Sequence, residues 1–210
     1  MQQSGLRELI EQGESITLEF KSTIESAEKI ARTLAAFANT RGGILLVGVE
    51  DDGQISGILS EEAEMGKIEE AAERLLQPPI DLVYESHHLR EIHVLLIRVD
   101  ESDQKPHRIK DRGGEDQVYL RVHDKNIPAG KSAERTLEYE PAPVDKALLQ
   151  SPNVKTLLHY LQTNDFITPK RFAKMINISE RRAGKLLTDL AEGQVITPVD
   201  RGNGIGYALK

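Results

Sequence analysis

The chain has 210 residues, of which 39% are hydrophobic and 29% charged, and its formal net charge is −7. This composition excludes a chain that is disordered throughout, and no apolar run approaches the roughly 20 residues that cross a bilayer. The absence of cysteine excludes disulfides, thiol nucleophiles and zinc sites built on thiolates. We therefore expect a cytoplasmic protein with no membrane partner.

The charge is divided unevenly along the chain. Residues 141–210 contain 10 Lys and Arg against 6 Asp and Glu, a net charge of +4. Residues 1–140 contain 17 Lys and Arg against 28 Asp and Glu, a net charge of −11. An acidic region followed by a basic one predicts two domains with different roles, 1–140 and 141–210, which meet near Pro141 and Pro143.

The acidic domain alternates helices and strands. The pattern predicts, in chain order, a strand over 16–21, a helix over 25–39, strands over 44–49 and 54–58, a helix over 60–76, strands over 80–85, 92–99 and 118–122, and a helix over 129–137. Glu19 is expected on the polar face of the first strand, and Gly42 and Gly43 as a left-handed helix cap before the second. Hairpins dominate the second half, so the expected fold class is α/β with a mixed sheet.

Three ordered segments of this domain resemble a known family. They read E-S-I-T-L-E-F-K at 14–21, A-F-A-N-T-R-G-G at 36–43 and G-V-E-D-D-G at 48–53, and Y-L-R-V follows at 119–122. Together they resemble the Schlafen-type AlbA_2 domain over residues 6–137. The resemblance implies either a DNA-binding module of a transcription regulator, as in prokaryotic members, or cleavage of structured RNA, as in vertebrate Schlafen proteins.

The nuclease alternative rests on three carboxylates. The resemblance places them on Glu14, Glu19 and Asp51, which would then be the catalytic residues and the ligands of Mg²⁺ or Mn²⁺. The same residues also have a structural interpretation, with Glu14 beside a helix end, Glu19 paired with Lys21, and Asp51 in a turn. The chain lacks the cysteines of the vertebrate zinc site and has one copy of the fold instead of two. We therefore expect nucleic-acid binding without cleavage and without a cofactor.

Two other groups in the acidic domain are candidate sites. The basic residues Lys105, Arg108, Lys110, Arg112 and Arg121 form either an arm that contacts phosphates or a solvated loop. The histidines at 87, 88 and 93 suggest a metal site, but a position in a hairpin turn favours solvated side chains.

The basic domain is predicted to contain three helices and a hairpin. The first helix covers 153–162. The second begins after its cap, Thr168, with Pro169 at its first position, and the third covers 180–191 after its cap, Ser179. Strands near 194–198 and 205–209 then flank a glycine-rich tip. This order resembles a winged helix-turn-helix over residues 150–210. The alternative for such a domain is docking to another protein.

Basic residues of the third helix lie opposite its apolar stripe, where a recognition helix meets DNA. They are Arg181, Arg182 and Lys185, and Arg201 in the wing can reach an adjacent phosphate. We therefore predict a DNA-binding transcription regulator that acts as a homodimer, with RNA as a second candidate partner. The alternatives are a metal-dependent ribonuclease and a protein-interaction adaptor.

Overall fold

The computed structural model describes residues 3–89, 92–110, 116–139, 141–200 and 204–210. The chain divides into two compact units, an N-terminal unit of residues 1–128 and a C-terminal unit of residues 129–210. The division thus falls before the expected boundary at residue 140. The reason is that helix α4 (Lys131–Glu138) packs against strand β9 (Ile196–Asp200). Gln194 Nε2 also donates a hydrogen bond to the carbonyl oxygen of Thr136, at 3.1 Å.

The main sheet of the N-terminal unit has four strands in the order β1-β2-β5-β4. Their bounds are β1 Leu18–Lys21, β2 Gly43–Val47, β5 Ile92–Val99 and β4 Val83–Leu89. The pair β1 and β2 is parallel, whereas β5 is antiparallel to both β2 and β4. The structure therefore confirms an α/β fold with a mixed sheet.

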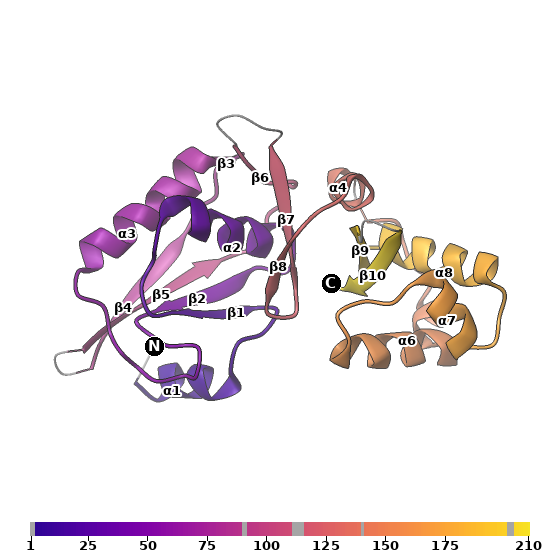
Figure 1. The fold of residues 1–210 in the computed structure, drawn as a ribbon, viewed down its shortest axis with the longest axis horizontal. Helices are drawn as coiled ribbons and strands as arrows, with labels where there is room; N and C mark the ends of the chain where they lie inside the picture. Colours follow the sequence, from indigo (N-terminus) through magenta and orange to yellow (C-terminus); the bar gives the residue numbers. More distant parts are fainter. Residues whose placement is uncertain (1–2, 90–91, 111–115, 140, 201–203) are drawn as a thin grey trace. The chain divides into compact units, whose positions relative to one another are not determined.

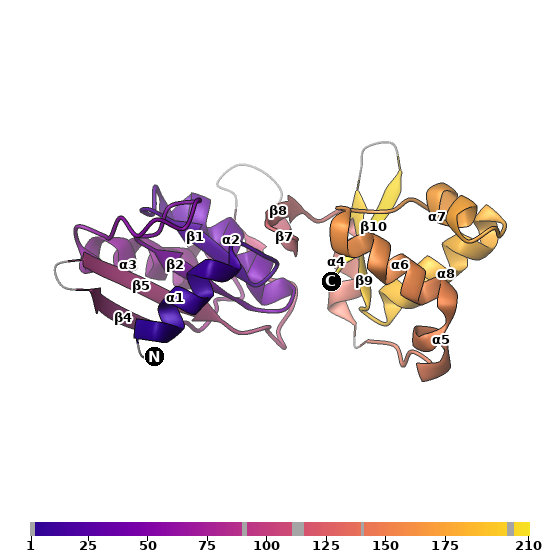
Figure 2. The ribbon, with the colours of Figure 1, turned by 90° about the horizontal axis from the view of Figure 1, so that it is seen from below.

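Helices cover both faces of this sheet, as Figures 1 and 2 show. Helices α2 (Ala27–Asn39) and α3 (Glu61–Glu70) cover one face, and a π-helical turn, Ala71–Leu75, continues α3. Helix α1 (Gln3–Gln12) covers the other face through Leu6. Because both faces are covered, the core residues of β2 and β5 are almost entirely apolar, which explains the continuous hydrophobic run in the sequence.

A smaller antiparallel sheet lies beside α2, in the order β3-β6-β7-β8. Its strands are β3 Leu76–Gln77, β6 Arg108–Ile109, β7 Gln117–Val122 and β8 Lys125–Pro128. The buried side chain of Asn39 holds this sheet at the end of α2. Its amide nitrogen donates to the carbonyl oxygens of His107 and Tyr119, and its oxygen accepts the His107 N–H at 2.7 Å.

Gly42 and Gly43 turn the chain from α2 into β2, as the sequence predicted. Gly42 has a positive φ of 70°, and its N–H donates to the carbonyl oxygen of Phe37 at 2.8 Å. A Cβ on Gly42 would lie 2.6 Å from the carbonyl oxygen of Val99, and one on Gly43 would meet the Phe37 ring. Only glycine fits both positions without displacing neighbours.

The C-terminal unit consists of five helices and one hairpin within the described residues. After α4 come α5 Lys146–Gln150, α6 Pro152–Thr163, α7 Pro169–Met175, α8 Glu180–Glu192, and the antiparallel pair β9 with β10 Ile205–Leu209. The hydroxyl oxygens of Thr168 and Ser179 cap α7 and α8, as the sequence predicted. Apolar residues of α6, α7 and α8, including Leu157, Phe172 and Leu187, form the core.

Three local expectations need correction. The strand expected over 54–58 is reduced to a single bridge between Val49 and Ile55. Glu19 is buried instead of lying on a polar face, because helices cover both faces of the sheet. His87 and His88 lie within β4 and not in a turn, since the pairing of β4 with β5 extends to Leu89.

No helix among the described residues has the length and apolar character needed to cross a membrane.

Candidate functional site

The carboxylate of Glu19 is the centre of a buried charged cluster in the N-terminal unit. Only 6% of this residue is exposed. Its Oε1 lies 2.6 Å from Lys21 Nζ, and its Oε2 lies 2.6 Å from Arg121 Nη2. A buried carboxylate is stable as an anion only when cations or N–H groups face it, and here one cation faces each oxygen.

Arg121 is fully buried, with 0% of its surface exposed. Its guanidinium donates hydrogen bonds to the carbonyl oxygens of Ser15 and Leu18 and to Asn126 Oδ1. It also lies 5.1 Å from the centre of the Phe37 ring, within cation–π range. The prediction that Arg121 contacts nucleic-acid phosphates is therefore wrong, because all sides of its guanidinium are enclosed by the protein.

Glu14 reaches the same region from the turn that precedes β1. Its Oε1 accepts a hydrogen bond from the Phe20 N–H at 2.9 Å. Burial raises the pKa of the Glu14 carboxyl above its ordinary value; the Phe20 hydrogen bond opposes this, and the charges of Glu19 and Asp51 add to it. The charges of Glu19 and Asp51 thus both act on the Glu14 carboxyl.

The three carboxylates do not fit a magnesium or manganese site as they stand. Among the described residues, Glu14, Glu19 and Asp51 do not bring one oxygen each within 4.8 Å of one another. Both oxygens of Glu19 already face cations, and Glu14 Oε1 already accepts a backbone N–H. A metal ion would have to displace Lys21 or Arg121, and displacing Arg121 would leave a buried guanidinium unpaired.

A family model named "Schlafen, AlbA_2" matches residues 14–130. The chain belongs to the Schlafen AlbA_2 family. The match contains the three carboxylates, Arg121 and the Asn39 contacts. It ends close to the division after Pro128, so the AlbA_2 domain and the N-terminal unit coincide over most of their length.

Two solved structures are similar to parts of the chain. The N-terminal domain of a RecG-related protein from Nitrosomonas europaea is 20% identical, with a TM-score of 0.45 over 67% of this chain and 95% of that one. The DIP2311 protein from Corynebacterium diphtheriae is 25% identical, with a TM-score of 0.40 over 55% of this chain. This chain spans 26% of that second protein. None of the curated proteins compared with the chain matches it.

The basic residues predicted near the end of the AlbA_2 domain do not form one surface. Lys105 pairs with the carboxylate of Glu101, and Arg108 is half-buried within β6. Lys110 is exposed, whereas Arg112 lies outside the described residues. Because Arg121 is buried, the five residues do not act together as a phosphate-contacting arm.

In the C-terminal unit, the first half of α8 presents basic side chains to solvent. Arg181, Arg182 and Lys185 are all exposed. The opposite face of the helix is buried through Ala183 and Leu187. The basic and apolar residues of α8 thus lie on opposite faces, as their helical spacing in the sequence predicted. Arg201 lies outside the described residues.

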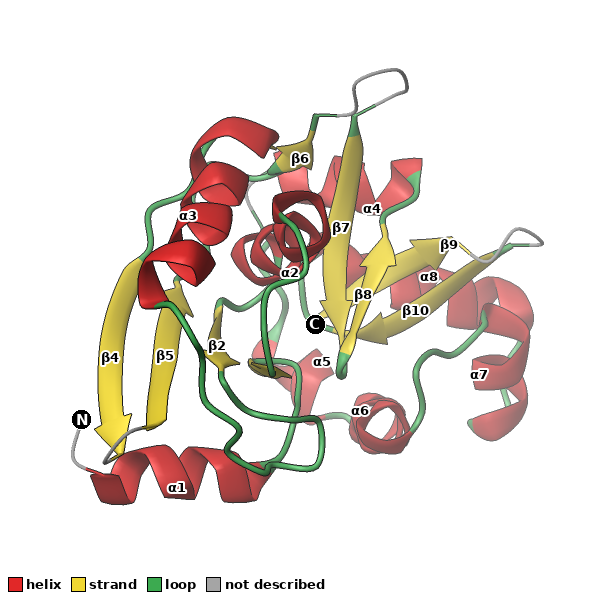
Figure 3. Ribbon diagram, turned by 60° about the vertical axis from the view of Figure 1, so that its left-hand side comes forward, coloured by secondary structure: helices red, strands yellow, loops and turns green. Residues whose placement is uncertain are grey.

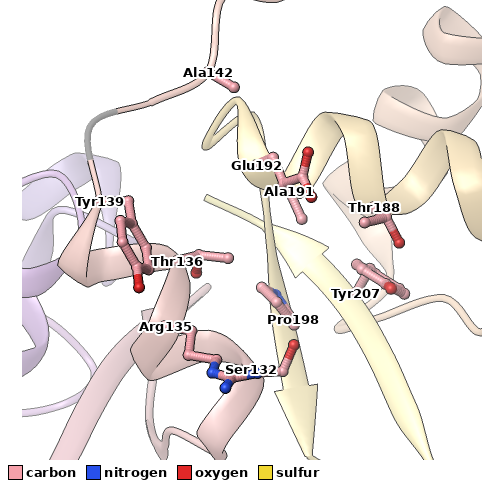
Figure 4. A pocket seen from close by; sticks show the side chains of 10 residues that line it. All are labelled: Ser132, Arg135, Thr136, Tyr139, Ala142, Thr188, Ala191, Glu192, Pro198 and Tyr207. Carbon is pink, nitrogen blue, oxygen red and sulfur yellow. The ribbon is translucent and has the colours of Figure 1, made fainter.

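A hollow of about 410 Å³ in the C-terminal unit was not predicted from the sequence. Figure 4 shows α4 side chains on one side of it and residues of α8, β9 and β10 on the other. Arg135 and Glu192 supply its charges, and Pro198 and Tyr207 supply apolar surface. The hollow forms because α4 packs on the hairpin, a long-range contact that no local sequence pattern indicates.

Proposed function

We propose that this AlbA_2 protein binds duplex DNA through its C-terminal unit, a winged helix-turn-helix, and regulates transcription by occupying its site. The observation that carries the proposal is the exposed basic face of α8, opposite the buried stripe of the same helix. In helix-turn-helix domains, the N-terminal residues of the second helix contact base edges while nearby cations contact phosphates.

The charge distribution within the unit supports this orientation. The preceding helix, α7, adds three exposed cations, Lys170, Arg171 and Lys174. Glu180 begins α8, and the other acidic residues of the helix, Asp189 and Glu192, lie in its second half. Cations on α7 and on the first half of α8 attract a phosphate backbone there, because short-range attraction outweighs the net negative charge of the chain at physiological salt.

The test is a DNA-binding measurement at several salt concentrations. The triple variant Arg181→Ala, Arg182→Ala, Lys185→Ala removes the α8 cations. A matched triple variant replaces three exposed lysines elsewhere in the unit with alanine: Lys131, Lys146 and Lys155. We expect the first to weaken binding and to reduce the salt slope by roughly 1 for each lost phosphate contact.

Equal binding by the α8 variant and the parent would contradict the proposal. Absence of DNA binding by the parent protein even at low salt would also contradict the proposal and would favour the protein-docking alternative. Specificity from one small helix-turn-helix is limited, so we also propose a homodimer that binds two half-sites, with the AlbA_2 domain providing oligomerisation or a further nucleic-acid contact. Light scattering that shows a monomer at every concentration would contradict the dimer.

A metal-dependent nuclease is the second candidate, because the charges of Glu19 and Asp51 both act on Glu14 and help to raise the pKa of its carboxyl. The test is incubation of the protein with structured RNA and with duplex DNA, with Mn²⁺ and with EDTA. Asp51→Asn is the suitable variant, because Asp51 is exposed and its substitution leaves the buried cluster intact. We expect no cleavage; metal-dependent cleavage that is lost in Asp51→Asn would establish the nuclease.

A further inference from the structure

Two histidines face each other near one end of the main sheet. His88 in β4 and His93 in β5 are directly opposite in the antiparallel register. Their ring centres are 4.3 Å apart, with the planes at 80° to one another. Antiparallel partners project to the same face of a sheet, so both imidazoles lie on the face that α3 covers.

The carboxylate of Glu61 completes the group. Glu61 is the first residue of α3, and Figure 3 shows this helix over β4 and β5. One ligand atom each from Glu61, His88 and His93 lies within 4.8 Å of the other two. We propose that these three residues bind a divalent transition metal ion, with Zn²⁺ as the expected occupant.

The ligand set and its spacing suit zinc. Two imidazoles and one carboxylate form an established zinc-binding combination that needs no thiolate. With bonds of about 2.0–2.1 Å, ligand atoms of a tetrahedral site lie about 3.3 Å apart, so small side-chain rotations from the observed positions close the site. Imidazole ligands disfavour Mg²⁺ and Ca²⁺, which prefer oxygen.

Ser86 orients these ligands from the same face of β4. Its hydroxyl donates a hydrogen bond to Glu61 Oε2 at 2.8 Å and lies 3.4 Å from His88 Nε2. Groups that hold metal ligands in this way usually contribute to metal affinity. His87 is not part of the site, because alternation along β4 turns it to the opposite face, where it lies 3.7 Å from Glu85.

A bound ion would connect the start of α3 to β4 and β5 and leave a coordination position open. Three protein ligands leave the fourth position of a tetrahedral zinc site for water or for a ligand from a partner. His88 is exposed, so solvent reaches the site. The inference concerns only the AlbA_2 domain and does not depend on DNA binding by α8.

The test is calorimetric titration of the full chain with Zn²⁺, together with the visible absorption of the Co²⁺ complex. We expect one ion per chain, and at least about tenfold weaker binding in each of His88→Ala, His93→Ala and Glu61→Gln. Matched controls are His159→Ala and Glu62→Gln, which change exposed residues of the same types.

The inference is overturned if the parent chain binds no Zn²⁺ stoichiometrically, or if the ligand variants bind as tightly as the controls. Circular dichroism of each variant shows whether it is folded. Because His88 is exposed, His88→Ala keeps the core intact, and a folded His88→Ala protein with unchanged affinity is by itself sufficient to reject the site.

Discussion

The substitution Arg121→Met should destabilise the N-terminal unit strongly. It removes the cation that faces Glu19 Oε2 at 2.6 Å, and with it the hydrogen bonds to Ser15, Leu18 and Asn126. Because the pair is buried, the remaining carboxylate loses a partner without gaining full hydration. Removal of one member of a buried ion pair costs about 3–5 kcal/mol, a large part of the roughly 5–15 kcal/mol that stabilises a typical domain.

Lys21→Met is the matched control, because Lys21 faces the other oxygen of the same carboxylate. Its side chain is 37% exposed, so water screens this pair more than the fully buried pair with Arg121, although the Glu19 side chain is only 7% exposed. Exposed ion pairs contribute about 0–1 kcal/mol and broken buried pairs cost about 3–5 kcal/mol, so this half-exposed pair should lower the free energy of unfolding by less than Arg121→Met does. The two substitutions therefore separate the effect of burial from the effect of charge on Glu19.

Urea unfolding followed by far-ultraviolet circular dichroism measures both effects, and hydrogen exchange assigns each transition to a unit. With a urea slope of about 2 kcal/mol per molar, Arg121→Met should lower the midpoint of the N-terminal unit by roughly 2 M. Adding Glu19→Gln to Arg121→Met should recover part of the loss, since glutamine leaves no buried charge. Equal midpoints for Arg121→Met and Lys21→Met would refute the assignment of Arg121 as a buried structural cation.

Two further predictions concern the sheet beside α2. Asn39→Ala leaves the backbone groups of His107 and Tyr119 without their side-chain partner. The free energy of unfolding should therefore fall by about 3 kcal/mol in the same urea assay. The control is Asn153→Ala, which changes an exposed asparagine and should alter this free energy little. Burial lowers the pKa of His107 below its ordinary value of 6.5, so its stabilising contribution is present above pH 6.5 and lost as the pH falls further. As the pH is lowered from 7.5 to 5.5, the free energy of unfolding of the His107→Asn variant should therefore fall by less than that of the parent. Equal falls in the two proteins would contradict this prediction.

The sequence by itself determined the elements whose causes are local. The caps at Thr168 and Ser179 and the glycine at 42 were identified correctly, because a cap or a left-handed turn depends on residues a few positions apart. The basic face of α8 was also predicted, since helical periodicity alone separates it from the buried stripe. The mixed sheet followed from the alternation of helices and strands.

Tertiary structure decided the roles of the charged and titratable residues. Arg121 was predicted to belong to a phosphate-contacting arm or a solvated loop, both of which would expose it. The fold instead brings it to Glu19, more than 100 residues earlier, and their pairing permits burial. His88 and His93 meet only because β4 extends to Leu89, and Glu61 joins them only because α3 covers that face. Burial and proximity between distant segments depend on packing, which local sequence patterns do not encode.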